Sequence, residues 1–197
     1  MKRMLFLLLL LLILMGCAQS ETPADVPAET PAVQETQKEP AAEETAPIPL
    51  GSFAAQTLTG DTLTEAFFAN ADLTVINVWA TFCGPCKEEM PVLAKLDQEL
   101  EHVQLLGIVT DVVDQSGTPD PDQVALAQEL ADLADCQYPN LILNESLAML
   151  GFAGLSAVPA TLFVDSEGNL VGQGFYGALN EEGWRSTIAE RLELAGS

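Results

Sequence analysis

Two apolar runs separated by a helical segment constrain the fold of this chain more than any other feature. Leu73–Trp79 (LTVINVW) and Val103–Thr110 (VQLLGIVT) are rich in β-branched residues, as expected of strands that are buried on both faces. Pro91 lies between them and is expected to kink the intervening helix near its second turn. Apolar residues recur at helical spacing in this segment, at Met90, Leu93, Leu96 and Leu100. The three segments predict a βαβ unit with a right-handed crossover.

Further elements flank this unit, and their boundaries are indicated by turn residues and helix caps. In chain order they are a β-hairpin across Ser52–Thr64 that turns at Gly60-Asp61, a helix from an Asp120 cap to about Ala134, a strand at Tyr138–Leu143, a short helix from an Asn144 cap to Leu150, an antiparallel hairpin of Ala160–Val164 and Leu170–Tyr176, and a helix from an Asn180 cap to about Ala195. We therefore expect an α/β fold, with a mixed central sheet, helices on both faces and an N-terminal hairpin extension.

The N-terminus has the pattern of an export signal. Lys2 and Arg3 precede twelve apolar residues, Met4 to Met15, a run too short for a membrane span of about 20 residues. Gly16 and Cys17 follow directly, and small residues before a lone cysteine resemble the lipobox of bacterial lipoproteins. The resemblance implies cleavage after residue 16 and lipidation of Cys17. A plain secretory peptide is the alternative.

Residues 18–47 differ in composition from the rest of the chain. They are rich in Pro, Ala, Glu and Thr, with no aromatic residue and no hydrophobic period, so we expect a disordered tether. The predicted organisation is a lipoprotein signal peptide at 1–16, the lipidated cysteine and tether at 17–47, and one globular domain at 48–197. The formal net charge of −22 would repel phosphate backbones, so no nucleic acid partner is expected.

The stretch WATFCGPCKEEMP, residues 79–91, places two cysteines where the first predicted strand gives way to its helix. A helix N-terminus favours a thiolate because unpaired N–H groups and the positive end of the helix dipole face the sulfur. We expect Cys83 to be the exposed nucleophile. Cys86, one turn into the helix and more buried, is expected to attack the mixed disulfide that Cys83 forms. The C-x-x-C spacing therefore predicts thiol-disulfide chemistry.

Two other roles for the cysteine pair fit the sequence less well. A zinc site needs a second pair of ligands, and only Cys136 and His102 are available. A static disulfide suits an exported protein, yet closing so short a loop gains little chain entropy. No metal and no cofactor are expected. We expect Cys136 to be a buried free thiol, the alternative being an extra redox cysteine, and His102 to end the first helix beside the negative dipole end.

The same stretch resembles the active-site sequence of the thioredoxin-like fold, and specifically of the membrane-anchored TlpA and ResA group. Val158-Pro159 followed by ATLFVD resembles the second landmark of that group, a cis-proline before a strand. The resemblance covers about Leu50 to the C-terminus. It implies that Pro159 lies against the dithiol, that the Val158 backbone pairs with an incoming substrate strand, and that Trp79 packs beside the active-site loop. An ordinary proline at the start of a strand is the alternative for Pro159.

Two residues near the cysteines, Asn77 and Glu89, bear on proton transfer to and from the second cysteine. Asn77 stands where cytoplasmic thioredoxins usually place a buried acid that takes the proton of the second cysteine, and an amide cannot accept it. Glu89, three residues after Cys86 and on the same helical face, occupies the position of an acid implicated in proton handling in ResA-like proteins. A solvated glutamate is the alternative for Glu89, and Lys87 is expected to be a solvated charge.

Together these features predict a lipid-anchored thiol-disulfide oxidoreductase at the extracytoplasmic face of a bacterial membrane. Gly-Pro between the cysteines matches thioredoxin, whose potential is about −270 mV, and this favours reduction of protein disulfides. The resemblance implies clients such as apocytochromes c or oxidised partner enzymes of the methionine sulfoxide reductase kind. It also implies a membrane electron donor of the CcdA or DsbD type. We expect a monomer.

Several related activities fit the sequence less well. A dithiol oxidase or isomerase of the DsbA sort usually carries a large helical insertion before the cis-proline, and only about one helix fits here. A peroxiredoxin normally has threonine three residues before its cysteine, where this chain has Ala80. A copper chaperone of the Sco type requires C-x-x-x-C. A non-catalytic binding lipoprotein would not need to keep both Cys83 and Cys86.

Overall fold

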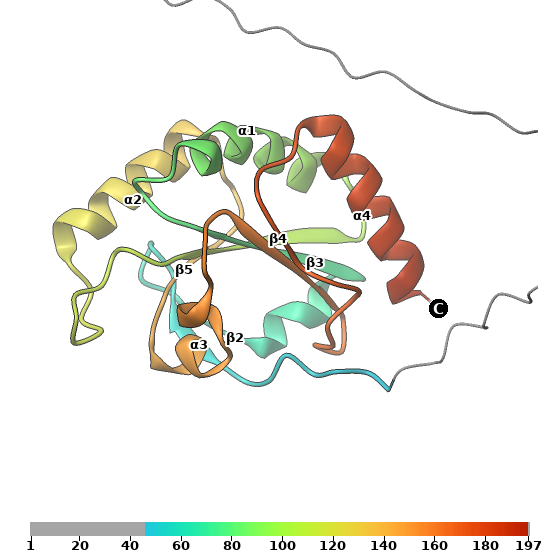
Figure 1. The fold of residues 1–197 in the computed structure, drawn as a ribbon, viewed down its shortest axis with the longest axis horizontal. Helices are drawn as coiled ribbons and strands as arrows, with labels where there is room; N and C mark the ends of the chain where they lie inside the picture. Colours follow the sequence, from blue (N-terminus) through green and yellow to red (C-terminus); the bar gives the residue numbers. More distant parts are fainter. Residues whose placement is uncertain (1–45, 197) are drawn as a thin grey trace, which may run out of the picture. The chain divides into compact units, whose positions relative to one another are not determined.

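Five strands form the central sheet of this protein, in the order β5-β4-β3-β6-β7. The structure is a computed structural model that describes residues 46–196. Figure 1 shows the strands crossing the middle of the domain. They are β3 (Leu73–Trp79), β4 (Val103–Val109), β5 (Asn140–Ile142), β6 (Ala160–Asp165) and β7 (Phe175–Tyr176).

The predicted βαβ unit forms the centre of the sheet. β3 and β4 pair in parallel along their whole lengths, from Leu73 opposite Val103 to Trp79 opposite Val109. Helix α1 (Gly84–Glu99) connects them and continues through Pro91. β6 pairs antiparallel with the other side of β3, so the sheet is mixed, as predicted. All seven residues of β3 are buried because strands flank it on both sides and side chains cover both faces.

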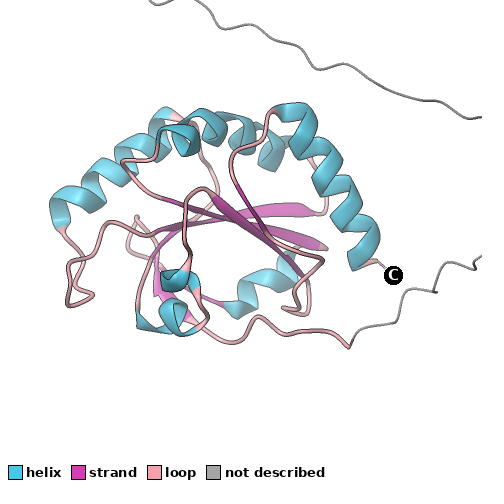
Figure 2. Cartoon of the chain, in the orientation of Figure 1, coloured by secondary structure: helices cyan, strands magenta, loops and turns pink. Residues whose placement is uncertain are grey.

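Helices cover both faces of the sheet (Figure 2). One face carries α1, α2 (Pro121–Leu133) and α4 (Glu181–Ala195), and the other carries α3 (Glu145–Met149) with the short 3-10 helices η1 (Glu65–Asn70) and η2 (Phe152–Gly154). The predicted caps hold at three helix starts, because side-chain oxygens accept backbone N–H groups there, from Asp120 at α2, Asn144 at α3 and Asn180 at α4.

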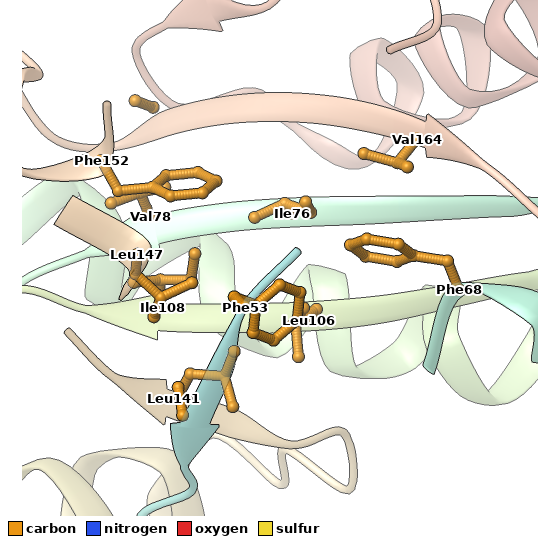
Figure 3. Close-up of a cluster of buried hydrophobic side chains, with 12 residues drawn as sticks. Phe53, Phe68, Ile76, Val78, Leu106, Ile108, Leu141, Leu147, Phe152 and Val164 are labelled. Atoms are coloured by element: carbon orange, nitrogen blue, oxygen red, sulfur yellow. The ribbon is translucent and has the colours of Figure 1, made fainter. Parts of the chain in front are cut away.

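Alternate residues of β3 divide between the two cores, as the two-residue repeat of a strand requires. Leu73 and Val75 pack with residues of α1 and α4 on one face. Ile76 and Val78 point to the other face, where Figure 3 shows them beside aromatic rings that include Phe53. The N-terminal hairpin, β1 (Ala54–Gln56) with β2 (Thr62–Thr64), forms a separate two-stranded sheet over this second core.

The last predicted hairpin differs most from the sequence-based expectation. The strand expected at Leu170–Tyr176 forms a bridge to Val164 at Leu170 and then regular pairing only at β7. Gly174 lies so close to the Thr161 carbonyl that a Cβ there would be 2.6 Å from the oxygen. Three residue steps from Val164 to Thr161 lie opposite five from Leu170 to Phe175, so two extra residues leave the ladder as a bulge. β5 also begins later than predicted, at Asn140 instead of Tyr138.

The chain enters the domain at the end of the sheet remote from Trp79. The Leu50 N–H donates to the Gly168 carbonyl at 2.9 Å, and the Leu170 N–H donates to the Ile48 carbonyl at 2.8 Å. This turn follows Asp165, which pairs with Leu73 at the start of β3. The predicted signal peptide, Cys17 and the tether to residue 45 lie outside the described residues. Within residues 46–196, no helix is both long and apolar enough to span a bilayer.

Candidate active site

The two cysteines of the C-x-x-C motif form a disulfide at the start of α1. Their sulfurs are 1.99 Å apart and their Cα atoms 5.3 Å apart. Cys83 is the N-cap of α1, and its Sγ accepts the Cys86 backbone N–H at 3.1 Å. The order of burial is as predicted, but Cys83 is less accessible than expected, with 5% of its surface exposed against 0% for Cys86. Only a small part of Cys83 is therefore open to solvent.

A group of hydrogen bonds fixes the turn that leads into the motif. The Asp111 carboxylate accepts the backbone N–H of Thr81 at 2.9 Å and the Thr81 hydroxyl at 2.6 Å. Lys87 is exposed, as expected, and its ammonium donates to the Thr81 carbonyl at 3.2 Å. Side chains from the loop after β4 and from α1 thus hold the two peptide groups on either side of Thr81, two residues before Cys83. This arrangement restricts the position of the backbone that leads to Cys83.

Trp79, the last residue of β3, is buried in the same cluster as the two cysteines. Its indole N–H donates to the Asn140 side-chain oxygen at 2.9 Å. Asn140 fits only because residue 107 is glycine, since a Cβ at Gly107 would lie 1.9 Å from that oxygen. Sequence reasoning missed Asn140. The one signal for it was a glycine inside a buried strand, which often marks a close approach by another group.

The peptide bond between Val158 and Pro159 is cis, as the resemblance implied. Pro159 is buried immediately before β6, and Ala160 pairs with Val78 next to Trp79. The partly buried Val158 side chain packs against the cluster that contains Cys83 and Cys86. The two motifs, 73 residues apart in the sequence, therefore meet at one end of the sheet.

Glu89 is buried, so the alternative of a solvated glutamate is wrong. Only 2% of its surface is exposed. The Asn77 amide donates to one carboxyl oxygen at 3.0 Å, and the Leu179 N–H donates to the other at 3.3 Å. Burial raises the pKa of Glu89 from 4.5 to about 7, and these hydrogen bonds limit the rise. The Trp184 indole N–H also limits the rise in the pKa of Glu89, although its geometry is not that of a full hydrogen bond.

Two candidate residues remain: Cys136, which packs against the cluster that contains Cys83 and Cys86, and His102. Cys136 is a partly buried free thiol whose Sγ–H donates to the Tyr138 hydroxyl at 3.4 Å. Burial raises the pKa of Cys136 to about 11, with nearby carboxylates acting in the same direction. The expectation for His102 is wrong, because α1 ends at Glu99 and His102 lies beyond it, exposed beside Asp72. In the described part of the chain, no group of three or more His, Cys, Asp or Glu side chains is placed to hold a metal ion.

Comparison with known proteins places this geometry in a family. The profile of the AhpC/TSA family matches residues 44–188. The chain belongs to this family. It is 30% identical over 148 residues to a thiol:disulfide interchange protein DsbE of Pseudomonas fluorescens biotype C, and the match covers 74% of each chain. The cysteine pair and this relative identify this AhpC/TSA family member as a thiol-disulfide oxidoreductase, as predicted.

Solved structures of low sequence identity share its fold. A thiol:disulfide interchange protein of the thioredoxin family from Chlorobium tepidum TLS matches with a TM-score of 0.62 and 18% identity, over 76% of this chain and 99% of that chain. The pneumococcal exposed lipoprotein thioredoxin of Streptococcus pneumoniae strain TIGR4 matches with a TM-score of 0.57 and 20% identity, over 71% and 99% of the respective chains. The thioredoxin-like fold predicted from the sequence is thereby confirmed.

Proposed function

We propose that this oxidoreductase reduces disulfides of client proteins outside the cytoplasm while a lipid on Cys17 holds it at the membrane. The observation that carries the chemical part is the position of Cys83, whose sulfur accepts a backbone N–H at the first turn of α1. In the reduced protein the same N–H and the helix dipole would stabilise a thiolate at this sulfur. A thiolate attacks disulfides, whereas a thiol does not.

The reaction consists of two exchanges. The Cys83 thiolate attacks one sulfur of the client disulfide, a bond forms between them, and the other client sulfur leaves as a thiolate that takes up a proton. The Cys86 thiolate then attacks the Cys83 sulfur and releases the second client sulfur. Two electrons pass from the dithiol to the client, and the disulfide between Cys83 and Cys86 is the oxidised product.

Glu89 is proposed to accept the proton of Cys86 before the second exchange. It lies one turn further along α1, on the same helical face as Cys86. A carboxyl with a pKa of about 7 exchanges protons near neutral pH, which a solvated glutamate does less well. Asn77, which cannot itself accept the proton, donates a hydrogen bond to this carboxyl. Glu89 on α1 thus supplies the acid that is absent at position 77.

Three further residues are proposed to bind the client beside the dithiol. The Val158 backbone, before the cis-proline, would pair with the client strand that carries the reacting cysteine. Pro159 would fix the conformation of this backbone segment, and Trp79 would hold the active-site turn. Burial of Trp79 and Pro159 in one end of the sheet supports these roles. A backbone segment that accepts an extended client strand supplies backbone hydrogen bonds without requiring one client sequence.

The membrane anchor and the partners are proposed from the sequence. The pattern around Cys17 supports lipidation, and one structural neighbour is itself described as an exposed lipoprotein thioredoxin. Apocytochromes c and oxidised partner enzymes are the proposed clients. A reductant in an oxidising compartment requires an electron source, for which a membrane protein of the CcdA or DsbD type is proposed. We propose that the chain acts as a monomer.

Reduction of insulin disulfides in the presence of dithiothreitol tests the proposal. Wild-type protein should accelerate it, Cys83→Ser should abolish the acceleration, and Cys86→Ser should accumulate a mixed disulfide with insulin. The reduction potential of the pair decides the direction: a value near −270 mV supports a reductant, and one near −120 mV identifies an oxidant instead. Turnover that is unchanged in both variants would refute the proposed role of the cysteines.

A further inference from the structure

A groove opens between the active-site turn, at Thr81 and Phe82, and the start of α2. Its volume is about 500 Å³. Its apolar wall consists of Phe82, Val113 and Leu126, and its acidic rim consists of Asp111, Asp114 and Asp120. These residues define the Phe82 groove. The loop between β4 and α2, at the left of Figure 1, supplies one side of it.

The apolar part of the Phe82 groove is unusually accessible. Phe82 is 75% exposed although it directly precedes Cys83, and Leu126 is 40% exposed on α2. Large apolar side chains in this position lose contact with water when a partner covers them. Because only 5% of Cys83 is exposed, a client that reaches this sulfur must pass over the neighbouring surface. Phe82 forms part of that surface.

The charged residues that line the groove are all acidic. From Leu96 to Trp184 the sequence contains fifteen acidic residues and neither lysine nor arginine. One cation of the described residues, Lys87, lies beside the groove, and its ammonium donates to the Thr81 carbonyl. The other cations of the described residues, Lys95, Arg185 and Arg191, each pair with a glutamate. A negative field of this extent attracts cationic partners and raises their association rates.

The same field excludes two other occupants of the groove. The segment from Ala18 to Pro47 carries seven acidic residues and one lysine, so it is repelled. A second copy of the chain would bring the same acidic rim. An apolar and cationic polypeptide satisfies both parts of the groove.

We infer that the Phe82 groove recognises the client segment next to the reacting cysteine, and that it selects segments with apolar side chains and lysine or arginine. This inference rests on the proposed function and adds the chemistry of the preferred client. The apolar side chain would cover Phe82 and Leu126, while the cationic side chains would approach Asp114 and Asp120. Selection of this kind acts mainly on the rate of encounter and is weakened by salt.

Peptide disulfides test the inference. Each peptide carries one cysteine joined to uncharged 2-mercaptoethanol, with a neighbouring leucine and either two arginines or two glutamates. The reduced full-length protein should react about ten-fold faster with the arginine peptide at low ionic strength, and the ratio should approach one near 1 M salt. Equal rates for the two peptides at low salt would overturn the inference.

Paired charge variants locate the effect. Asp114→Asn with Asp120→Asn removes two rim charges, and asparagine can still accept the backbone N–H groups that both carboxylates accept now. This variant should lose most of the arginine preference. The control, Glu145→Gln with Glu167→Gln, removes two exposed charges away from the groove and should keep it. An equal loss in both variants would assign the preference to overall charge and refute the role of the groove.

A second pair of variants tests the apolar wall. Leu126→Ser should slow the reaction with the leucine peptide relative to one with serine in its place, whereas Leu133→Ser, at the far end of α2 and 76% exposed, should not. Identical effects would contradict the inference. Bis(2-hydroxyethyl) disulfide, which is small and uncharged, reports on the dithiol alone. Failure to reduce it would refute the proposed function, whereas its reduction without peptide selectivity would refute only the inference.

Discussion

Replacing Glu89 by glutamine should remove a pH-dependent loss of stability. The folded protein keeps the Glu89 proton up to a pKa of about 7, while the unfolded chain releases it near 4.5. Between these values the folded state binds more protons, so the free energy of unfolding falls as the pH rises through this window. The separation of about 2.5 pH units, at 1.36 kcal/mol per unit, corresponds to about 3 kcal/mol. The loss is complete above pH 7 and absent below 4.5.

The glutamine variant has no such proton, and its amide can be accommodated. The oxygen of the new glutamine can accept the Leu179 N–H. In the wild type the Asn77 Oδ1 has no hydrogen-bond partner among the described residues, and a half-turn of the Asn77 amide would present this oxygen to the new N–H group of the glutamine. Relative to wild type, the variant should therefore gain about 3 kcal/mol between pH 4 and pH 8. This large dependence follows from burial, because water would stabilise the charge of an exposed carboxylate.

Urea unfolding of the oxidised protein, followed by tryptophan fluorescence from pH 4 to pH 8, measures this difference. Glu88→Gln is the matched control, since Glu88 is the preceding residue of α1 and its side chain is exposed. It should keep the wild-type slope. If Glu89→Gln also keeps that slope, Glu89 does not titrate in the window, and its proposed role as proton acceptor near neutral pH fails with it.

Two further predictions concern residues around the site. Gly107→Ala should lower the free energy of unfolding by about 2 to 5 kcal/mol, because the new methyl group displaces the Asn140 amide and leaves the Trp79 indole N–H without its acceptor. A loss below about 1 kcal/mol in urea unfolding would contradict this packing. Cys136, with its pKa of about 11, should react with iodoacetamide at pH 8 at least about ten-fold more slowly than free cysteine, and unfolding should abolish the difference. Peptide mapping by mass spectrometry checks this, and fast labelling of the folded protein would refute the burial of the thiol.

Most of the fold could be predicted because its local signals agree with each other. The β-branched runs at β3 and β4 and the caps at Asp120 and Asn180 depend only on neighbouring residues, and the structure has each of them. The interruption before β7 could not be predicted in this way. It depends on how closely Gly174 approaches the Thr161 carbonyl, a contact between strands that the alternation of apolar residues does not encode.

The same distinction applies to the site. Cys83, Cys86 and Pro159 belong to local motifs, and the structure has the disulfide and the cis peptide bond that these motifs predict. Asn140 and Asp111 act through side chains that reach Trp79 and Thr81 from other elements, so no short pattern identifies them. The sequence does not decide the burial of Glu89 for a similar reason, since the groups that surround its carboxyl come from β3 and from the segment before α4.

The point at which the chain enters the domain gives the molecule a front and a back. Ile48 and Leu50 are hydrogen-bonded to the turn at one end of the sheet, whereas Cys83 follows the opposite end of β3. The seven residues of β3 separate these ends by about 20 Å, at roughly 3.3 Å per residue. The attachment proposed through Cys17 would therefore act on the back of the molecule. The opening to Cys83 would lie at the end of the sheet opposite that attachment.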